Sequence, residues 1–148
     1  MRFYFWSFHT GEIGKGATRL GKILLDSNVV IAFLEPENEN HEISTAVLLN
    51  SENDYFLASL SIAECLIIAF RQGYEFAIEA LLKIKQLVVS VFSISEEIAF
   101  SAAQIGAELN VTLADSVIMA TAESYGIVLW TFDKRLARKS SRIKYLLE

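Results

Sequence analysis

The chain has 148 residues, a formal net charge of −5, 53% hydrophobic residues and a single proline. This length and composition are typical of one compact domain, and they exclude a disordered protein and one with the roughly 20-residue apolar run that spans a membrane. The negative charge gives no general attraction for nucleic acid, so a nucleic-acid partner would require a local basic patch or a bound cation.

Residues 1 to 21 differ in composition from the rest, because an aromatic start gives way to several glycines and basic residues. We expect a leader of uncertain structure there: a flexible segment, an added edge hairpin or the product of an early start codon. A single domain is expected over residues 22 to 148.

The domain opens with the dense apolar run Ile23-Leu24-Leu25, which is typical of a strand buried on both faces. A second apolar run, from Val29, predicts a helix that stops at Glu35-Pro36. Asp26 therefore lies where a buried strand ends and a helix begins, which is where ligands and chemistry collect in parallel α/β sheets.

Strands and helices alternate along the remainder of the chain. The patterns predict strands over 55–58, 87–92 and 127–130, and helices over 40–49, 61–73, 74–85, 98–109, 113–125 and 133–139. This alternation implies a parallel sheet covered by helices on both faces, and hence an α/β fold.

The helix expected after Ser61 is apolar almost all round. One sheet covers only one side of a helix, so we expect a neighbouring helix or another subunit on the other side, and we favour the subunit. The only cysteine, Cys65, lies in this helix, which indicates an inert core thiol. A lone cysteine also fits a reducing cytoplasm.

An acid stands at each junction from a strand to the next helix: Asp26, Glu64, Asp115 and Asp133. In a parallel sheet these junctions share one edge, so acids distant in sequence can converge there. Their mutual repulsion would call for a cation, and hard oxygen ligands without a His or Cys cluster suit Mg²⁺ or Mn²⁺.

Helix capping is the competing interpretation of each acid. Ser61 to Glu64 and Thr112 to Asp115 both have capping-box spacing, as does Ser93 to Glu96. Asp133 fits a helix N-cap. The apolar neighbours of Asp115, from Leu113 to Met119, weigh against simple capping there, because a carboxylate on such a background needs a partner.

Four motifs resemble those of the PIN-domain ribonucleases, and they cover residues 22 to 140 in the right order. The first reads Ile23-Leu-Leu-Asp26-Ser-Asn28, and the second Leu60-Ser-Ile-Ala-Glu64. The third is Leu113-Ala-Asp115-Ser-Val-Ile-Met-Ala, and the fourth runs from Gly126 to Thr131-Phe-Asp133. The resemblance is closest to the VapC-type toxins of toxin–antitoxin pairs.

The resemblance implies a Rossmann-like three-layer α/β/α fold with a central, mainly parallel sheet. It also implies a toxin that hydrolyses RNA phosphodiester bonds with metal-activated water and is inhibited by an antitoxin. Its metal is Mg²⁺ or Mn²⁺, and we expect a homodimer. Transferred by position, the catalytic and metal-binding residues are Asp26, Glu64, Asp115 and Asp133, supported by Asn28 and Thr131.

The chain after Asp133 is basic and would steer the phosphate backbone of RNA through Lys134, Arg135, Arg138, Lys139, Arg142 and Lys144. The alternative for this stretch is a solvated helix face that complements its own helix dipole.

Two other functions remain open. One is a catalytically inactive PIN-like module that binds RNA or protein. The other, less favoured, is an aspartyl phosphatase with Asp26 as nucleophile, for which Asn28 stands where a second acid is needed.

Overall fold

A five-stranded parallel sheet forms the centre of the computed structural model, which describes residues 21–49 and 52–148. Its strand order is β3-β2-β1-β4-β5. The strands are β1 (Gly21–Leu25), β2 (Asn53–Ala58), β3 (Ser90–Phe92), β4 (Val128–Thr131) and β5 (Ile143–Tyr145). The chain enters at the central strand, β1, and the carboxyl ends of all five strands meet at one edge.

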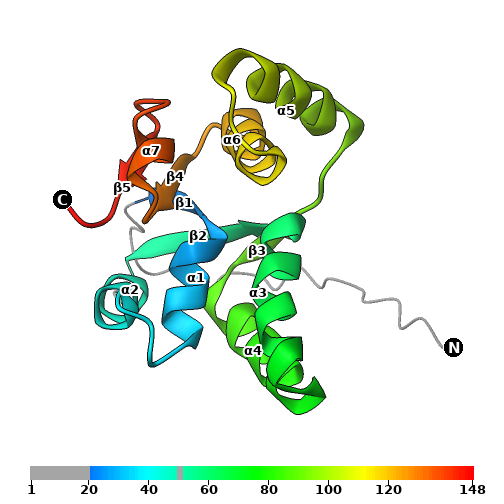
Figure 1. Cartoon of the computed structure of the whole chain (residues 1–148). Coiled ribbons are helices and arrows are strands. Elements are labelled where there is room, and N and C mark those ends of the chain that lie inside the picture. The colour runs from blue at the N-terminus through cyan, green and yellow to red at the C-terminus, as the bar shows by residue number, and fades with distance from the viewer. Residues whose placement is uncertain (1–20, 50–51) are drawn as a thin grey trace, which may run out of the picture.

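Seven helices are described. They are α1 (Ser27–Leu34), α2 (His41–Leu48), α3 (Ser59–Gln72), α4 (Tyr74–Leu87), α5 (Glu96–Leu109), α6 (Leu113–Tyr125) and α7 (Lys134–Ala137). In Figure 1, α5 and α6 lie at the top and α3 and α4 at the bottom, with the sheet between them. None of the helices in the described part of the chain is long and apolar enough to cross a membrane.

The strands divide their side chains between two cores, as the alternation of a pleated strand requires. Ile23 and Leu25 of β1 face a core built with α1 to α4, whereas Leu24 faces a second core built with α5 to α7. Both faces of the sheet are therefore covered, which confirms the predicted α/β fold and its three layers.

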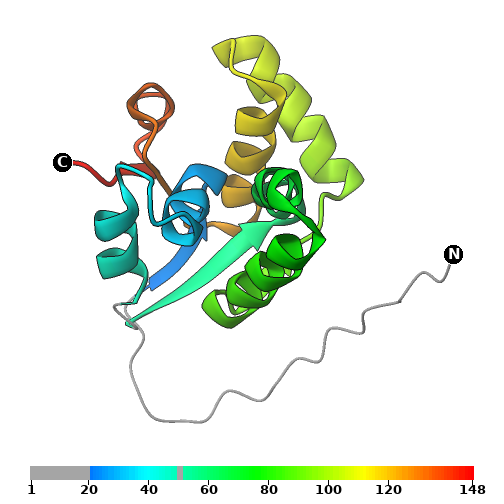
Figure 2. The same ribbon diagram turned by 60° about the horizontal axis from the view of Figure 1, so that its bottom comes forward.

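Two helix pairs add to the simple alternation of strand and helix. Helix α4 packs against α3 through the small residues Ala69, Ala77 and Ala80, so a neighbouring helix covers part of the all-round apolar α3. Ile67 and Phe70 of α3 remain half exposed. Helices α5 and α6 form the second pair, and both views show it on the other face of the sheet (Figures 1 and 2).

The structure corrects several of the predicted boundaries and adds one strand. The strand expected over 87–92 begins only at Ser90, and the basic helix expected over 133–139 is the single turn α7. The fifth strand, β5, was not predicted, because it is three residues long and only its first residue is buried. Residues 1–20 of the expected leader lie outside the described residues, while Gly21 already belongs to β1.

Candidate active site

Asp26 directly follows β1 at the carboxyl edge of the sheet, and its backbone N–H still donates to the Trp130 carbonyl of the neighbouring strand at 2.9 Å. This bond fixes the residue beside the end of β4, and only 6% of its surface is exposed. The Thr131 hydroxyl donates to Asp26 Oδ2 at 2.7 Å, and the Ser27 hydroxyl lies 3.4 Å from Oδ1. The carboxylate is thus held from both sides.

Asn28 and Thr131 form the rest of this network, 103 residues apart in sequence. Asn28 Nδ2 donates to Thr131 Oγ1 at 3.1 Å, and its Oδ1 accepts from the Phe132 N–H at 3.1 Å. Thr131 Oγ1 also accepts from the Asp133 N–H at 2.9 Å. Because Thr131 Oγ1 accepts from two donors, its own hydrogen points to Asp26, and Asn28 and Thr131 belong to one hydrogen-bond network with that acid.

The pKa of Asp26 is raised from 3.8 to about 6, and burial is the largest cause. The Thr131 hydrogen bond opposes the rise, and the negative charges of Asp115 and Glu64 make smaller contributions to it. A carboxylate raised by burial and by two like charges gains most from a nearby cation. Asp115 and Glu64 are therefore near enough to act electrostatically on Asp26.

Glu64 is not a capping acid. Helix α3 begins two residues earlier than expected, at Ser59, and its N-cap is Ala58, without a side-chain cap. Glu64 therefore lies in the second turn and is half buried. The capping interpretation of the Ser61 to Glu64 spacing is wrong, which leaves the Glu64 carboxylate without a helix-capping role.

Asp115 lies in the first turn of α6, which is capped by Thr112, whose Oγ1 accepts from the Asp115 N–H at 3.1 Å. This cap involves the backbone of Asp115 and not its carboxylate, and the residue is half buried. The surroundings of Asp115 are less buried than the sequence indicated, because its neighbour Leu113 is 75% exposed. Ser95, and not Ser93, caps α5, so the Ser93 to Glu96 spacing is not a capping box either.

Asp133 is the N-cap of α7. Its Oδ1 accepts from the Arg135 N–H at 2.7 Å and from the Leu136 N–H at 3.2 Å, and Arg135 lies 3.6 Å from Oδ2. Asp133 is not among the charges that act on Asp26. Of the four predicted acids, Asp115 and Glu64 act electrostatically on Asp26. Asp133 is linked to Asp26 through hydrogen bonds to the shared Thr131 hydroxyl.

A groove of about 490 Å³ lies between the start of α6 and the α7 region, and Asp26 and Glu64 are not among the residues that line it. Asp115 and Asp133 both line it, together with the cations Arg135, Arg138 and Lys139. Asn110 and Thr112 also line the groove. From the sequence, Thr112 was named only for its capping spacing, and Asn110 was not named. The groove therefore combines an acidic end with a basic wall.

The donor chemistry of this site fits a hard divalent cation. Carboxylates are the ligands that Mg²⁺ and Mn²⁺ prefer, and a cation would offset both the burial of the Asp26 charge and its repulsion by Asp115 and Glu64. As the side chains lie, no three His, Cys, Asp or Glu residues in 21–49 and 52–148 are close enough to hold one metal ion. Asp26 is fixed by its hydrogen bonds, whereas Glu64 and Asp115 are half buried.

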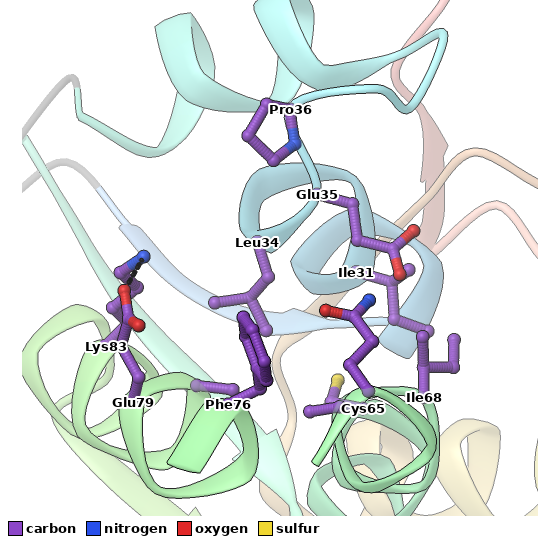
Figure 3. Close-up of a pocket in the computed structure, with 12 residues that line it drawn as sticks. Ile31, Leu34, Glu35, Pro36, Cys65, Ile68, Phe76, Glu79 and Lys83 are labelled. Atoms are coloured by element: carbon purple, nitrogen blue, oxygen red, sulfur yellow. Dashed lines mark ion pairs between the residues drawn. The ribbon is translucent and has the colours of Figure 1, made fainter.

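A second pocket, of about 220 Å³, lies between the end of α1 and helices α3 and α4 (Figure 3). It is lined mainly by apolar side chains such as Ile31, Leu34 and Phe76, with the Glu79–Lys83 ion pair at its rim. Cys65 faces α1 there, and burial raises the pKa of its thiol to about 12, which agrees with an inert core cysteine.

Comparison with known proteins identifies the fold. The family model of the PIN domain matches residues 23–141. The structure is similar to VapC20 from Mycobacterium tuberculosis, a sarcin–ricin loop cleaving toxin, with a TM-score of 0.71 and 14% identity over 80% of this chain and 95% of that one. It is also similar to FitAcB from Neisseria gonorrhoeae, with a TM-score of 0.68 and 22% identity over 85% of this chain and 99% of that one.

A toxin–antitoxin complex from Klebsiella pneumoniae has a TM-score of 0.69 and 17% identity, over 84% of this chain and 97% of that one. No curated protein sequence matches the chain. At these identities the solved structures show a shared fold, whereas the family model covers all four motifs. The chain belongs to the PIN domain family.

Proposed function

We propose that this protein is an endoribonuclease that uses Mg²⁺ or Mn²⁺ and acts as the toxin of a toxin–antitoxin pair. The observation that carries the proposal is the buried carboxylate of Asp26, held at the carboxyl edge of the central strand and coupled to Asp115 and Glu64. No basic side chain is among the groups that shift the pKa of Asp26. A buried carboxylate without a basic partner destabilises the fold, and a role in binding a cation would explain why the protein has one here.

Asp26 and Asp115 would hold the cation, and Glu64 and Asp133 would complete the acidic surroundings. When bound, a divalent ion supplies a Lewis acid that stabilises charge on the phosphate and lowers the pKa of water. The protein's own contribution is orientation, because the Thr131 hydroxyl fixes the Asp26 carboxylate at 2.7 Å and the Asn28 amide in turn holds that hydroxyl at 3.1 Å. Glu64, which is half buried, would accept a proton from water in this proposal.

The basic wall of the groove gives the RNA backbone a path to the acids. Arg135, Arg138 and Lys139 line the groove, and Lys139 Nζ also donates to the Leu109 carbonyl at 3.2 Å. Lys134 does not line the groove, since its Nζ lies 3.2 Å from Glu148 Oε1. The RNA contact is therefore proposed for three of the six cations named from the sequence, because Lys134, Arg142 and Lys144 do not line the groove.

The partners follow from the similar structures, several of which are toxin–antitoxin complexes, some of them with DNA. We propose a cognate antitoxin that inhibits this chain, and a homodimer for which the half-exposed Ile67 and Phe70 of α3 offer apolar surface. The lone, buried Cys65 fits the reducing cytoplasm in which such a pair would act.

The direct test is cleavage of a labelled single-stranded RNA library with Mn²⁺ or Mg²⁺, and with a chelator as the control. The wild type should cut the RNA, Asp26→Asn and Asp115→Asn should lose the activity while they stay folded, and Glu123→Gln should retain it. Glu123 is an exposed acid on the same helix as Asp115, so it matches the loss of one negative charge. Equal cleavage by wild type and Asp26→Asn would refute the proposal.

An inactive module that binds RNA is the second candidate, and the separation of the acids beyond shared-ligand distance favours it. RNA binding without cleavage at any Mn²⁺ concentration would identify it. The phosphatase has no such support, because both ends of the Asn28 amide are bonded, to Thr131 and to the Phe132 N–H.

A further inference from the structure

The hydroxyl of Ser61 is buried and has no hydrogen-bond partner within the described part of the chain. Ser61 is 0% exposed, and its Oγ is one of two side-chain polar atoms in this condition, the other being Thr45 Oγ1 on α2. Burial of a hydroxyl without a partner costs stability, and such groups are rare in folded proteins. Ser61 therefore needs an explanation beyond the packing of α3.

The position of Ser61 relates it to Asp26. Ser61 lies in the first turn of α3, three residues after β2 ends, at the same edge of the sheet as Asp26. It shares the buried side of α3 with Cys65, four residues later, whose thiol lies 3.9 Å from the Ser27 carbonyl at the start of α1. The side of α3 that carries Ser61 thus faces α1, and Ser61 lies one turn nearer than Cys65 to the sheet edge.

The acids of the site enclose the same region. Glu64 lies on α3 within one turn of Ser61, and its charge acts on both Asp26 and Cys65. Asp26 itself accepts hydrogen bonds from Thr131 and Ser27, one at each carboxylate oxygen. Ser61 is therefore a polar group at the acid site that the hydrogen-bond network around Asp26 does not use.

We propose that Ser61 is a positioning residue of the acid site, whose hydroxyl forms a hydrogen bond to an oxygen in the ligand shell of a divalent cation held by Asp26. This inference rests on the proposed function. It explains why the hydroxyl is kept at a buried position where alanine would pack without an unsatisfied polar atom. Groups that orient the ligands of a metal in this way commonly change metal affinity about 10- to 100-fold when they are removed.

The test compares Ser61→Ala with Thr45→Val, which removes the other partnerless hydroxyl at a site on α2. For the full chain and both variants, we would measure the thermal unfolding midpoint without metal and the dissociation constant for Mn²⁺ by calorimetry. We expect both variants to keep or raise the wild-type midpoint, because each loses an unsatisfied buried group. Ser61→Ala should bind Mn²⁺ about tenfold more weakly, whereas Thr45→Val should match the wild type.

A lower midpoint for Ser61→Ala with unchanged Mn²⁺ affinity would overturn the inference, since it would show that the hydroxyl serves the fold. Failure of Ser61→Ala to fold would overturn it for the same reason. If the wild type bound Mn²⁺ and cleaved RNA but Ser61→Ala had the same affinity, the inference alone would fail. If the wild type bound no Mn²⁺, the proposed function would fail, and this inference with it.

Discussion

At the scale of single residues, Asp26 is the group whose burial and charge are in conflict. A carboxylate that is 6% exposed and near two other acids is costly when it is ionised, and the pKa of about 6 expresses that cost. The residue is nevertheless held by Thr131 and Ser27, which are donors suited to the ionised form. The donors around Asp26 therefore suit its charged form, and a bound cation would offset the cost of burying that charge.

The stability of the metal-free protein should depend on pH through Asp26. Its pKa is raised from 3.8 to about 6 on folding, so the folded state binds more protons between these values. The free energy of unfolding should therefore fall as the pH rises from about 4 to about 6, and this contribution should stay constant above pH 6. Urea titrations from pH 4 to 8 would measure the change.

Asp26→Asn is the control for this dependence, since it has no charge to lose. Its unfolding free energy should lack the decline between pH 4 and 6 and should exceed that of the metal-free wild type at pH 7.5. A wild-type stability that rises through this window, with the variant unchanged, would contradict the assigned direction of the pKa shift.

Thr131 is the residue on which the network depends, because it bonds Asp26, Asn28 and the Asp133 N–H at once. Thr131→Val keeps the shape and removes the hydroxyl, so we expect a loss of about 1–3 kcal/mol of stability. The pKa of Asp26 should also rise, since the Thr131 bond lowers it. The pH midpoint of Mn²⁺ binding should then move upward from that of the wild type.

Calorimetric titrations of Mn²⁺ between pH 5 and 8 would locate both midpoints, and Thr121→Val provides the matched control. Thr121 is also buried, and its hydroxyl donates only within α6, to the Val117 carbonyl at 2.7 Å. An equal shift in both variants would mean that the effect is not transmitted through Asp26.

At the scale of elements, α7 shows how one acid serves both fold and site. Asp133 caps this four-residue helix, and its N–H is bonded to Thr131. Asp133→Asn should keep the cap within about 0.5 kcal/mol but lose the charge, because Asn caps as well as Asp, whereas Asp133→Ala should cost about 1 kcal/mol. We therefore expect Asp133→Asn to be stable and impaired in RNA cleavage.

Unfolding and cleavage measurements on the two variants separate these roles. If Asp133→Asn cleaved RNA as well as the wild type, Asp133 would be a cap only. If it were as unstable as Asp133→Ala, its charge would belong to the fold.

Most elements were predictable because their apolar patterns are long. Helix α6 runs from Leu113 to Tyr125 as expected, and β1 follows its dense apolar run. The failures have local causes. Strand β5 was missed because only one of its residues is buried. The start of α3 at Ser59 was missed because a helix that begins without a side-chain cap leaves no signal in the sequence. The Ser61 to Glu64 spacing was misleading for that reason.

The candidate site was predictable as four acids at the ends of strands, and the Asn28–Thr131 support came from the resemblance. What the sequence could not show was how unequal the acids are. Asp26 is buried and coupled to two of the others, while Asp133 is committed to a cap. These differences come from packing between β1, β4 and α3, which spacing along the chain does not encode.

At the scale of the whole molecule, an acidic protein with a net charge of −5 has a groove with a basic wall. We expect Arg138→Ala to weaken RNA binding and to reduce its salt dependence by about one phosphate contact. Lys134→Ala is the matched control, since Lys134 pairs with Glu148 outside the groove. Filter binding to the Asp26→Asn protein at several salt concentrations would measure both, and equal losses would refute the proposed path.

The central claim is that Asp26 anchors a divalent cation, and calorimetric titration of Mn²⁺ at pH 7.5 tests it most directly. The wild type should bind Mn²⁺ with millimolar or tighter affinity, and Asp26→Asn, shown to be folded by its cooperative unfolding, should bind none at this site. Equal binding by the two proteins, or no binding by a folded wild type, would contradict the account.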